Sequence, residues 1–365
     1  MILQLKCFTL LRRVNEIKKK LTVWVVLDRK AGHRSLTMGM LGSLRYEYSL
    51  RVTEVRYRAW TRPLGRLLQR CWPLGFSFAC CGMAGRDKFG ESPDIIIGSG
   101  GGVQWAVAAL GKKKSAFSIF IGSPRSIPVS DYGMVIHYDP SLESSGVVLL
   151  PALPGPINHE TTALAAKNFI EGRAPLNHKI ACCMIGGNGA GYEWSEKDGN
   201  LLGDRLNEVA AQKGLRWVIT TSRRTPREME SALRNRLSKS SIYDACWAGE
   251  GDARRVVAAY LGLAERVLVS EDSMSMMHEA MASGIPVSVF SSNQHRIDPK
   301  HENFILKAEY EKWIQRLRLD NANFVDSFCS HSSVFDLPLD AMVCSKITPL
   351  LQQFFVARAD KVKKF

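Results

Sequence analysis

One stretch, residues 266–290 (RVLVSEDSMSMMHEAMASGIPVSVF), constrains the fold more than any other part of the chain. The run 266–269 is short and β-branched and predicts a strand, and the polar residues after it are of the kinds that cap helices. Methionines then recur at helical spacing until Gly284 and Pro286, which are typical of a helix end. A second apolar strand is predicted at 285–290. Two short strands joined by one helix form a βαβ unit, so the sheet should be parallel.

The start of this predicted helix is a candidate anion site. A helix that begins at the carboxyl end of a strand presents free N–H groups and the positive end of its dipole, which favour a phosphate. Ser275 and Glu279 are four residues apart and share one face of the helix, where the carboxylate could hold the two hydroxyls of a ribose. The alternative is that Glu279 is merely solvated and the serines merely cap, because one βαβ unit does not establish binding.

Length and charge divide the chain into two unlike parts. With 365 residues, two domains are expected. Residues 1–114 hold 21 Lys and Arg against 7 Asp and Glu, whereas the remaining residues hold 28 of each. The first part is therefore strongly basic, which indicates an anionic partner. Nucleic acid is not the partner that we favour.

The cysteine pattern and the hydropathy indicate in which cellular compartment the protein is found. Nine cysteines form no CxxC pair, which favours reduced thiols in the cytoplasm. No stretch reaches the length of about eighteen apolar residues that a spanning helix needs. The opening MILQLKCFTLL is interrupted by Lys6 and makes a poor signal peptide. We expect a cytoplasmic protein that is peripheral on the inner face of the membrane.

The first part of the chain has the pattern of a Rossmann-like domain. Strands are predicted at 21–27, 93–97, 118–121, 132–137 and 147–150, with helices after the first two. Polar or glycine-containing loops follow three of these strands at Lys30 to His33, Ser99 to Gly102 and Pro124-Arg125. In the segment 51–75, basic residues interleave with aromatic ones, which suits a membrane interface. A helix with an ordinary solvated basic face is the alternative.

The second part repeats the same plan. Strands are predicted at 180–185, 217–221 and 242–247 before the βαβ unit, with helices at 195–213 and 252–263 and a last helix at 347–358. Glycine-rich or Arg-containing loops follow the strands. An Arg pair, a glycine loop, a helix N-terminus and a carboxylate are the parts needed to hold a nucleoside diphosphate. No GxGxxG, P-loop or Asp-x-Asp pattern is present, so we expect no metal and no cofactor besides a nucleotide-sugar co-substrate.

These elements predict an α/β fold with two facing Rossmann-like domains and an inter-domain cleft. The expected boundaries are an N-terminal extension at 1–20, a basic acceptor domain at 21–170, a linker at 171–179, a donor domain at 180–335 and a C-terminal helix region at 336–365, which packs back on the first domain.

Six segments carry a resemblance to a known family: LDRKAGH (27–33), PDIIIGSG (93–100), GSPR (122–125), MIGG (184–187), TTSRRTP (220–226) and SEDSMSMMHEA (270–280). In this order they resemble the bacterial family named after the plant elongated-mitochondria fission factor, which is described as glycosyltransferases or nucleoside-diphosphate-sugar epimerases. The resemblance implies a glycosyltransferase-B-like fold with the donor nucleotide on the C-terminal domain. The layout is also similar to the lipid-linked N-acetylglucosaminyltransferase of peptidoglycan synthesis, where a histidine loop and a ribose-binding Glu match His33 and Glu279.

The candidate site residues follow from these patterns. For catalysis we expect His33 as a general base with Asp28 beside it, although an isolated histidine is more often structural. The donor-binding candidates are Gly186, Gly187, Asn188, Ser222, Arg223, Arg224, Glu250, Asp272, Ser273, Ser275 and Glu279. The acceptor-side candidates are Lys30, Gly32, Ser99, Gly100, Pro124 and Arg125.

The leading hypothesis is a glycosyltransferase that moves a sugar from a nucleotide donor to an anionic, membrane-associated glycolipid of the lipopolysaccharide-core type. The alternatives are an epimerase that acts on a nucleotide sugar, or a membrane-surface adaptor that keeps the fold without catalysis.

Overall fold

The computed structural model describes residues 18–56, 91–125, 127–173, 176–252, 254–291, 297–330, 335 and 338–362. The chain divides into two compact units, residues 1–135 with 344–365 and residues 136–343. Most of the basic and aromatic segment 51–75 lies outside the described residues. Among the helices of the described residues, none has the length and apolar character needed to span a bilayer.

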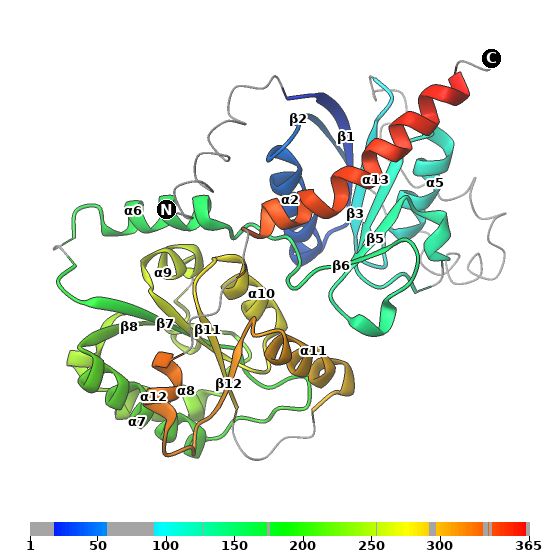
Figure 1. Ribbon diagram of the computed structural model, residues 1–365. Coiled ribbons are helices and arrows are strands. Elements are labelled where there is room, and N and C mark those ends of the chain that lie inside the picture. Colours follow the sequence, from blue (N-terminus) through cyan, green and yellow to red (C-terminus); the bar gives the residue numbers. More distant parts are fainter. Residues whose placement is uncertain are drawn as a thin grey trace. The chain divides into compact units, whose positions relative to one another are not determined.

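Two six-stranded sheets form the framework (Figure 1). The first sheet has the order β2-β1-β3-β4-β5-β6 and the second the order β12-β11-β10-β7-β8-β9. The strands of the first sheet are β1 (Lys20–Leu27), β2 (Ser49–Arg56), β3 (Ile95–Ser99), β4 (Phe117–Ile121), β5 (Met134–His137) and β6 (Val147–Leu149). Those of the second are β7 (Lys179–Ile185), β8 (Leu215–Thr221), β9 (Ile242–Cys246), β10 (Arg266–Ser270), β11 (Val287–Ser291) and β12 (Gln315–Arg318). The parallel α/β plan is confirmed.

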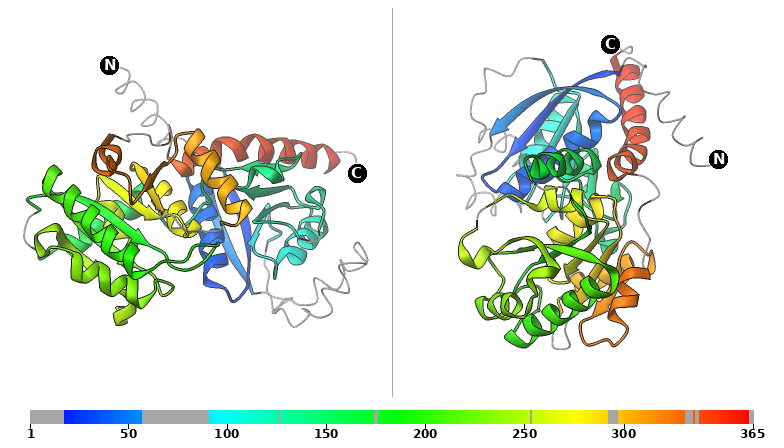
Figure 2. Two further views of the ribbon diagram at one scale, coloured as in Figure 1. Left: turned by 90° about the horizontal axis from the view of Figure 1, so that it is seen from below. Right: turned by 90° about the vertical axis from the view of Figure 1, so that its left-hand side faces the viewer.

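Helices follow most strands and complete the crossover connections (Figures 1 and 2). They are α2 (Ala31–Arg45), α5 (Gln104–Lys114), α6 (His159–Ile170), α7 (Glu196–Lys213), α8 (Arg227–Arg236), α9 (Val257–Leu263), α10 (Met274–Ala282), α11 (Pro299–Tyr310), α12 (Phe324–Ser330) and α13 (Leu339–Val362). Single turns of 3-10 helix are η6 (Val129–Asp131), η7 (Pro140–Leu142), η8 (Lys239–Ser241) and η9 (Ala248–Glu250).

The predicted βαβ unit is present as β10, α10 and β11. Val267 pairs with Val287 in parallel register, and Val269 with Val289. On α10 the buried side chains include Met277 and Met281, as the helical spacing of the methionines indicated. The other side of β10 pairs with β7, so β10 is an interior strand of the second sheet.

Several elements differ from the sequence-based expectation. The start of segment 51–75 belongs to strand β2, whose Val55 is buried although its neighbours are charged. No element was predicted between residues 290 and 347, yet α11, β12 and α12 lie there. Residue 252 does not begin a helix, because Asp252 accepts hydrogen bonds from the backbone N–H and the side chain of Arg254 in the turn before α9. Short strands and strands of mixed polarity give a weak periodic signal.

The core of the second unit is built around β7 and β8. Trp217 is fully buried, and its indole N–H donates to the Leu206 carbonyl of α7 at 2.9 Å. A Ser195 and Asp198 capping box fixes the start of α7, because each side chain bonds the backbone N–H of the other residue. The strands whose ends carry the candidate donor residues are therefore held in place by a well-packed core.

Candidate nucleotide-sugar site

The N-terminus of α10 lacks a side-chain cap and is only partly accessible, because Ser273 is buried. Its N-cap residue Ser273 makes no side-chain capping bond, and the first turn of α10 contains no acidic residue. Ser275 in that turn is exposed. The first N–H groups of a helix have no partner within the helix, so this end keeps free donors and a positive dipole end. This is the arrangement that binds a phosphate.

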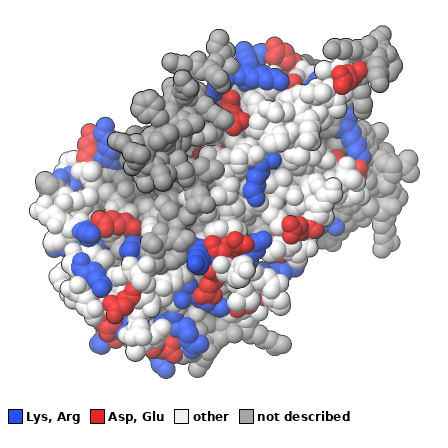
Figure 3. All heavy atoms as spheres, viewed as in Figure 1, with Lys and Arg blue, Asp and Glu red and all other residues white. Residues whose placement is uncertain are grey.

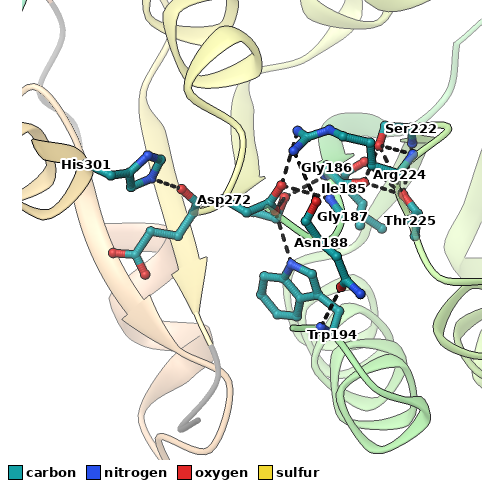
Figure 4. Close-up of polar contacts among 12 residues, drawn as sticks. Ile185, Gly186, Gly187, Asn188, Trp194, Ser222, Arg224, Thr225, Asp272 and His301 are labelled. Atoms are coloured by element: carbon teal, nitrogen blue, oxygen red, sulfur yellow. Dashed lines mark hydrogen bonds and ion pairs between the residues drawn. The ribbon is translucent and has the colours of Figure 1, made fainter. Parts of the chain in front are cut away.

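Asp272, just before this helix, faces inward and joins three loops (Figure 4). Its buried carboxylate accepts hydrogen bonds from the Gly187 N–H at 2.8 Å, the Trp194 indole N–H at 3.1 Å and the Ser270 hydroxyl at 2.7 Å. Arg224 Nη2 lies 3.4 Å from Asp272 Oδ2. Burial raises the pKa of Asp272, while these hydrogen bonds oppose the rise. Asp272 therefore positions the loops and has little capacity left for a ligand.

The loops after β7 and β8 are locked to each other. The hydroxyls of Ser222 and Thr225 both donate to the Gly186 carbonyl, and the Asn188 N–H donates to the Arg224 carbonyl at 3.2 Å. A Cβ on Gly187 would lie only 2.1 Å from the Arg224 backbone, so this close approach requires glycine. The Asn188 side chain accepts from the Trp194 N–H at 2.9 Å and is used inside the loop.

The Arg224 guanidinium is held by two contacts within the protein, while part of the side chain remains exposed. Besides the contact with Asp272, its Nη1 donates to the Asn188 carbonyl at 3.3 Å, yet half of the side chain stays exposed. Arg223 is exposed. A guanidinium fixed in this way can donate its remaining N–H groups to a phosphate without first losing much conformational freedom.

Among the described residues, the Glu279 carboxylate has no hydrogen-bond or ion-pair partner. It lies one turn beyond Ser275 on α10 and is partly buried. Burial raises its pKa, and no hydrogen bond or ion pair within the described residues offsets this cost. A desolvated carboxylate without a partner is well suited to accept hydrogen bonds from ligand hydroxyls.

Glu250 lies in the turn after β9 and pairs with Arg234 of α8. The same turn is held to the end of β8, because the Ala248 N–H donates to the Thr221 hydroxyl at 2.8 Å. The buried Glu230 carboxylate accepts from the Gly249 N–H at 3.2 Å and from the Thr221 hydroxyl at 2.5 Å. The sequence patterns did not single out Thr221 or Glu230 for this role.

In the first unit, Asp28 and His33 form a pair. The Asp28 carboxylate, 4% exposed, lies 2.7 Å from His33 Nδ1, and the His33 side chain is 25% exposed. His33 belongs to the first turn of α2 and not to the preceding loop, where the sequence placed it. Gly100, at φ +89°, lies against the ring, and a Cβ there would come within 2.1 Å of the imidazole. With Nδ1 directed at Asp28, Nε2 remains available for a substrate proton.

The acceptor-side candidates differ in accessibility. The side chains of Lys30 and Arg125 are exposed. The Lys30 N–H donates to Asp28 Oδ1 at 2.9 Å, and the Arg125 N–H donates to Gln104 Oε1 at 3.2 Å. The Ser99 hydroxyl is buried and donates to the Ile121 carbonyl at 3.0 Å, so it holds β3 to β4. Gly32 is exposed and Pro124 partly buried.

Sequence patterns missed three residues that support the donor cluster: Trp194, Thr225 and Ser270. Trp194 and Ser270 both bond Asp272, and Ser270 also accepts from the Gly186 N–H at 2.7 Å. Thr225 and Ser270 lie inside the segments 220–226 and 270–280, but nothing in the sequence says that their hydroxyls point inward. On the face shown in Figure 3, acidic and basic side chains are interspersed over the second unit.

The two parallel sheets and the loops at their strand ends define a glycosyltransferase-B-like fold, which glycosyltransferases and UDP-GlcNAc epimerases share. The chain belongs to the family described as Mitochondrial fission ELM1, whose model matches residues 31–326. It is also similar to an uncharacterized protein, RP120, of Rickettsia prowazekii, with 24% identity over 317 residues, covering 76% of this chain and 86% of that protein.

Two of the solved structures to which the chain is similar are the following. UDP-GlcNAc 2-epimerase from Methanocaldococcus jannaschii matches with a TM-score of 0.54 and 10% identity, covering 91% of this chain and 100% of that one. ADP-heptose lps heptosyltransferase II of E. coli matches with a TM-score of 0.43 and 12% identity, covering 91% and 99%. At these identities the likeness concerns the fold alone.

Proposed function

We propose that the protein is a glycosyltransferase that moves a sugar from a nucleotide donor to an anionic, membrane-associated glycolipid of the lipopolysaccharide-core type. The donor diphosphate binds at the N-terminus of α10 beside Arg224, with Arg223, Ser273 and Ser275 around it. Glu279 accepts hydrogen bonds from the ribose hydroxyls. The protein works at the cytoplasmic face of the membrane.

The observation that carries this proposal is the partly buried Glu279 carboxylate, which has no hydrogen-bond or ion-pair partner within the described residues and lies one turn beyond the exposed Ser275 of α10. Burying a carboxylate without a partner costs free energy, and a ligand with two adjacent hydroxyls would repay that cost. The half-exposed Arg224 provides the charge for a diphosphate beside the same helix. Together they match the ribose and the diphosphate of a nucleotide sugar.

The Asp28 and His33 pair supports a transfer reaction. In the proposed step, His33 Nε2 takes the proton of the acceptor hydroxyl while its oxygen forms a bond to the anomeric carbon. The bond from that carbon to the diphosphate oxygen breaks, and the nucleoside diphosphate leaves with the electron pair. Asp28 holds the ring through Nδ1 and stabilises the imidazolium.

The anionic acceptor is supported by charge. Residues 1–114 carry an excess of 14 positive charges, whereas the rest of the chain is neutral. Long-range attraction would concentrate a phosphorylated or carboxylated acceptor, or an anionic membrane surface, at the first domain.

Binding of a nucleoside diphosphate tests the donor site. Glu279→Ala and Arg224→Ala should each weaken binding about ten-fold or more, since a charge-assisted contact is worth about 1.5–3 kcal/mol. Circular dichroism should stay native, and the matched control Glu309→Ala, an exposed glutamate on α11, should bind like the parent. Unchanged affinity in both site variants would refute the assignment.

The alternatives give different products. An epimerase would convert a nucleotide sugar on its own, whereas a transferase needs the acceptor and releases nucleoside diphosphate. A non-catalytic adaptor would neither convert nor transfer. Chromatography of a nucleotide sugar, incubated with and without an acceptor extract, separates the three classes.

A further inference from the structure

We infer that the first unit binds the anionic phospholipid surface of a membrane through the amino edge of its sheet, where β1 and β2 begin. The inference deepens the proposed function and rests on it, because it names the surface that would hold the protein beside a membrane-associated acceptor. Six cations mark this surface, which we call the basic edge: Lys18, Lys19, Lys20, Arg45, Lys113 and Lys114.

The positive charge of the chain is concentrated in the first unit. Residues 1–135 and 344–365 hold 27 Lys and Arg against 9 Asp and Glu, whereas residues 136–343 hold 22 against 26. Such an excess of one sign repels itself in the folded state and attracts surfaces of the opposite sign. An anionic surface would therefore bind this unit and not the other.

Contacts at the start of β1 bring cations from three elements together. Lys18 Nζ donates to the Arg45 carbonyl at 2.7 Å, which joins the start of β1 to the end of α2. Lys19 Nζ lies 4.3 Å from the centre of the Phe355 ring of α13. The side chains of Lys18, Lys19 and Arg45 are all exposed, so their charges face solvent on one side of the unit.

The end of α5 belongs to the same edge. Lys113 is exposed, and Lys114 Nζ lies 5.5 Å from the centre of the Trp24 ring of β1. Phe117, the first residue of β4, packs edge-on against Phe354 of α13 with their ring centres 5.3 Å apart. The end of α5 and the start of β1 therefore lie beside the same part of α13.

Acidic side chains do not neutralise the basic edge. Among the described residues, none of the six cations forms an ion pair. Two further acids, Glu47 and Asp360, still leave the edge with an excess of four positive charges, and a cluster of this kind is typical of binding to anionic lipids. The other acids of this edge pair with other cations: Glu91 with Arg51, Asp94 with Arg358 and Asp131 with Lys112.

The composition of the basic edge favours a bilayer over a nucleic acid. Five of its six cations are lysines, which act as point charges, whereas Arg is the residue better suited to nucleic-acid phosphates. The Trp24 ring is buried and Lys19 lies over the Phe355 ring, which disfavours base stacking. Val356, next to Phe355, is 63% exposed and adds an apolar side chain, which suits the headgroup region of a bilayer.

Docking at this edge also limits the acceptor. The strand β1 begins at Lys20 and has eight residues, and Asp28 of the catalytic pair follows its other end. At about 3.3 Å per residue, the two ends are about 26 Å apart. A glycolipid in the docked membrane therefore reaches His33 only with an extended sugar chain, which favours an oligosaccharide core over a lipid that carries one sugar.

Sedimentation with vesicles of phosphatidylcholine and phosphatidylglycerol tests the inference. The parent should bind them in a salt-dependent manner and should not bind vesicles of phosphatidylcholine alone. Replacing Lys20, Arg45 and Lys113 with Gln should weaken binding about a hundred-fold, since each charge near the surface contributes about five-fold. These three side chains are exposed, so the variant should stay folded. The matched control replaces three exposed lysines of the second unit with Gln and should bind like the parent: Lys197, Lys239 and Lys300.

The inference is wrong if the parent does not bind these vesicles, if the basic-edge variant binds them like the parent, or if both variants lose affinity equally. It is also wrong if the basic-edge variant loses binding to a single-stranded RNA but keeps vesicle binding, because the surface would then serve a nucleic acid. Nucleoside diphosphate binding by the parent separates the two proposals. Vesicle binding through the basic edge without nucleoside diphosphate binding would refute the proposed function and leave the docking surface in place.

Discussion

His278 should make the stability of the second unit sensitive to acid. The side chain is 8% exposed and sits on α10, with the rings of Tyr138 and Phe304 within about 5 Å of its own. Its Nε2 is buried and has no hydrogen-bond partner in the part of the chain that the structure describes. Burial, together with the nearby His137 and His301, lowers the pKa of His278 from 6.5 to about 3. Substitution of His278 should therefore remove part of the acid sensitivity.

The sign and size follow from proton linkage. Above about pH 7, neither the folded nor the unfolded state protonates His278, so it contributes nothing to the pH dependence. As the pH falls below 6.5, His278 binds a proton in the unfolded chain, whereas in the folded chain it stays neutral until about pH 3. Stability is therefore lost across this window as the pH falls, by about 2 kcal/mol between about pH 7 and about pH 5.

Urea unfolding at about pH 7 and about pH 5 measures this loss. His278→Leu, a substitution of similar size, should lose about 2 kcal/mol less than the parent between the two values. His178→Gln, at an exposed histidine, serves as the control and should lose as much as the parent. If His278→Leu is as acid-sensitive as the parent, His278 is not held neutral by its burial.

Three further predictions concern the proposed activity. His33→Ala should keep donor affinity and lower turnover at least about a hundred-fold, with a smaller loss for Asp28→Asn, as steady-state kinetics would show; near-normal turnover in His33→Ala would place the base elsewhere. Gly187→Ala should weaken nucleoside diphosphate binding in calorimetry and lower the melting temperature, because its Cβ would push the Arg224 backbone away. An affinity and a melting temperature like those of the parent would contradict the close packing of the loops after β7 and β8. A variant with four Arg-to-Gln substitutions in the segment 51–75 should bind anionic vesicles more weakly in a sedimentation assay, by about 1 kcal/mol per charge; the positions are Arg58, Arg62, Arg66 and Arg70. If the parent protein binds vesicles with an affinity that does not depend on salt, the membrane-surface role is excluded.

The sequence predicted the fold where periodicity and strand-end chemistry agreed. The apolar runs before Asp28, Gly186 and Asp272 are β1, β7 and β10, and each ends in a loop that holds a candidate residue. Strand β2 was missed because Arg51 and Glu54 give it a charged face. In β12 only Leu317 is buried among its four residues, so its apolar signal was too weak to see.

The candidate site was only partly predictable, because side-chain direction decides which polar groups remain available. The loops were placed correctly at the strand ends, but several of their polar groups are satisfied internally. The Ser99 hydroxyl joins two strands, the Asn188 amide closes its own loop and Glu250 pairs with Arg234. The Ser99 and Glu250 contacts join residues 22 and 16 positions apart, and none of the three contacts follows from spacing along the sequence.

The three acids of the segment 270–280 show how the fold sorts residues that look alike in sequence. Glu271 and Asp272 follow one strand directly, and successive side chains of an extended chain point to opposite sides. Glu271 is buried toward β12, with Arg316 Nε 2.5 Å from Oε1, and Asp272 is buried toward the loops of β7 and β8. Both carboxylates therefore have structural partners within the protein. Glu279, one turn into the helix, is the acid of this segment for which the described part of the chain supplies no partner, which is why the proposed function assigns it to the ligand.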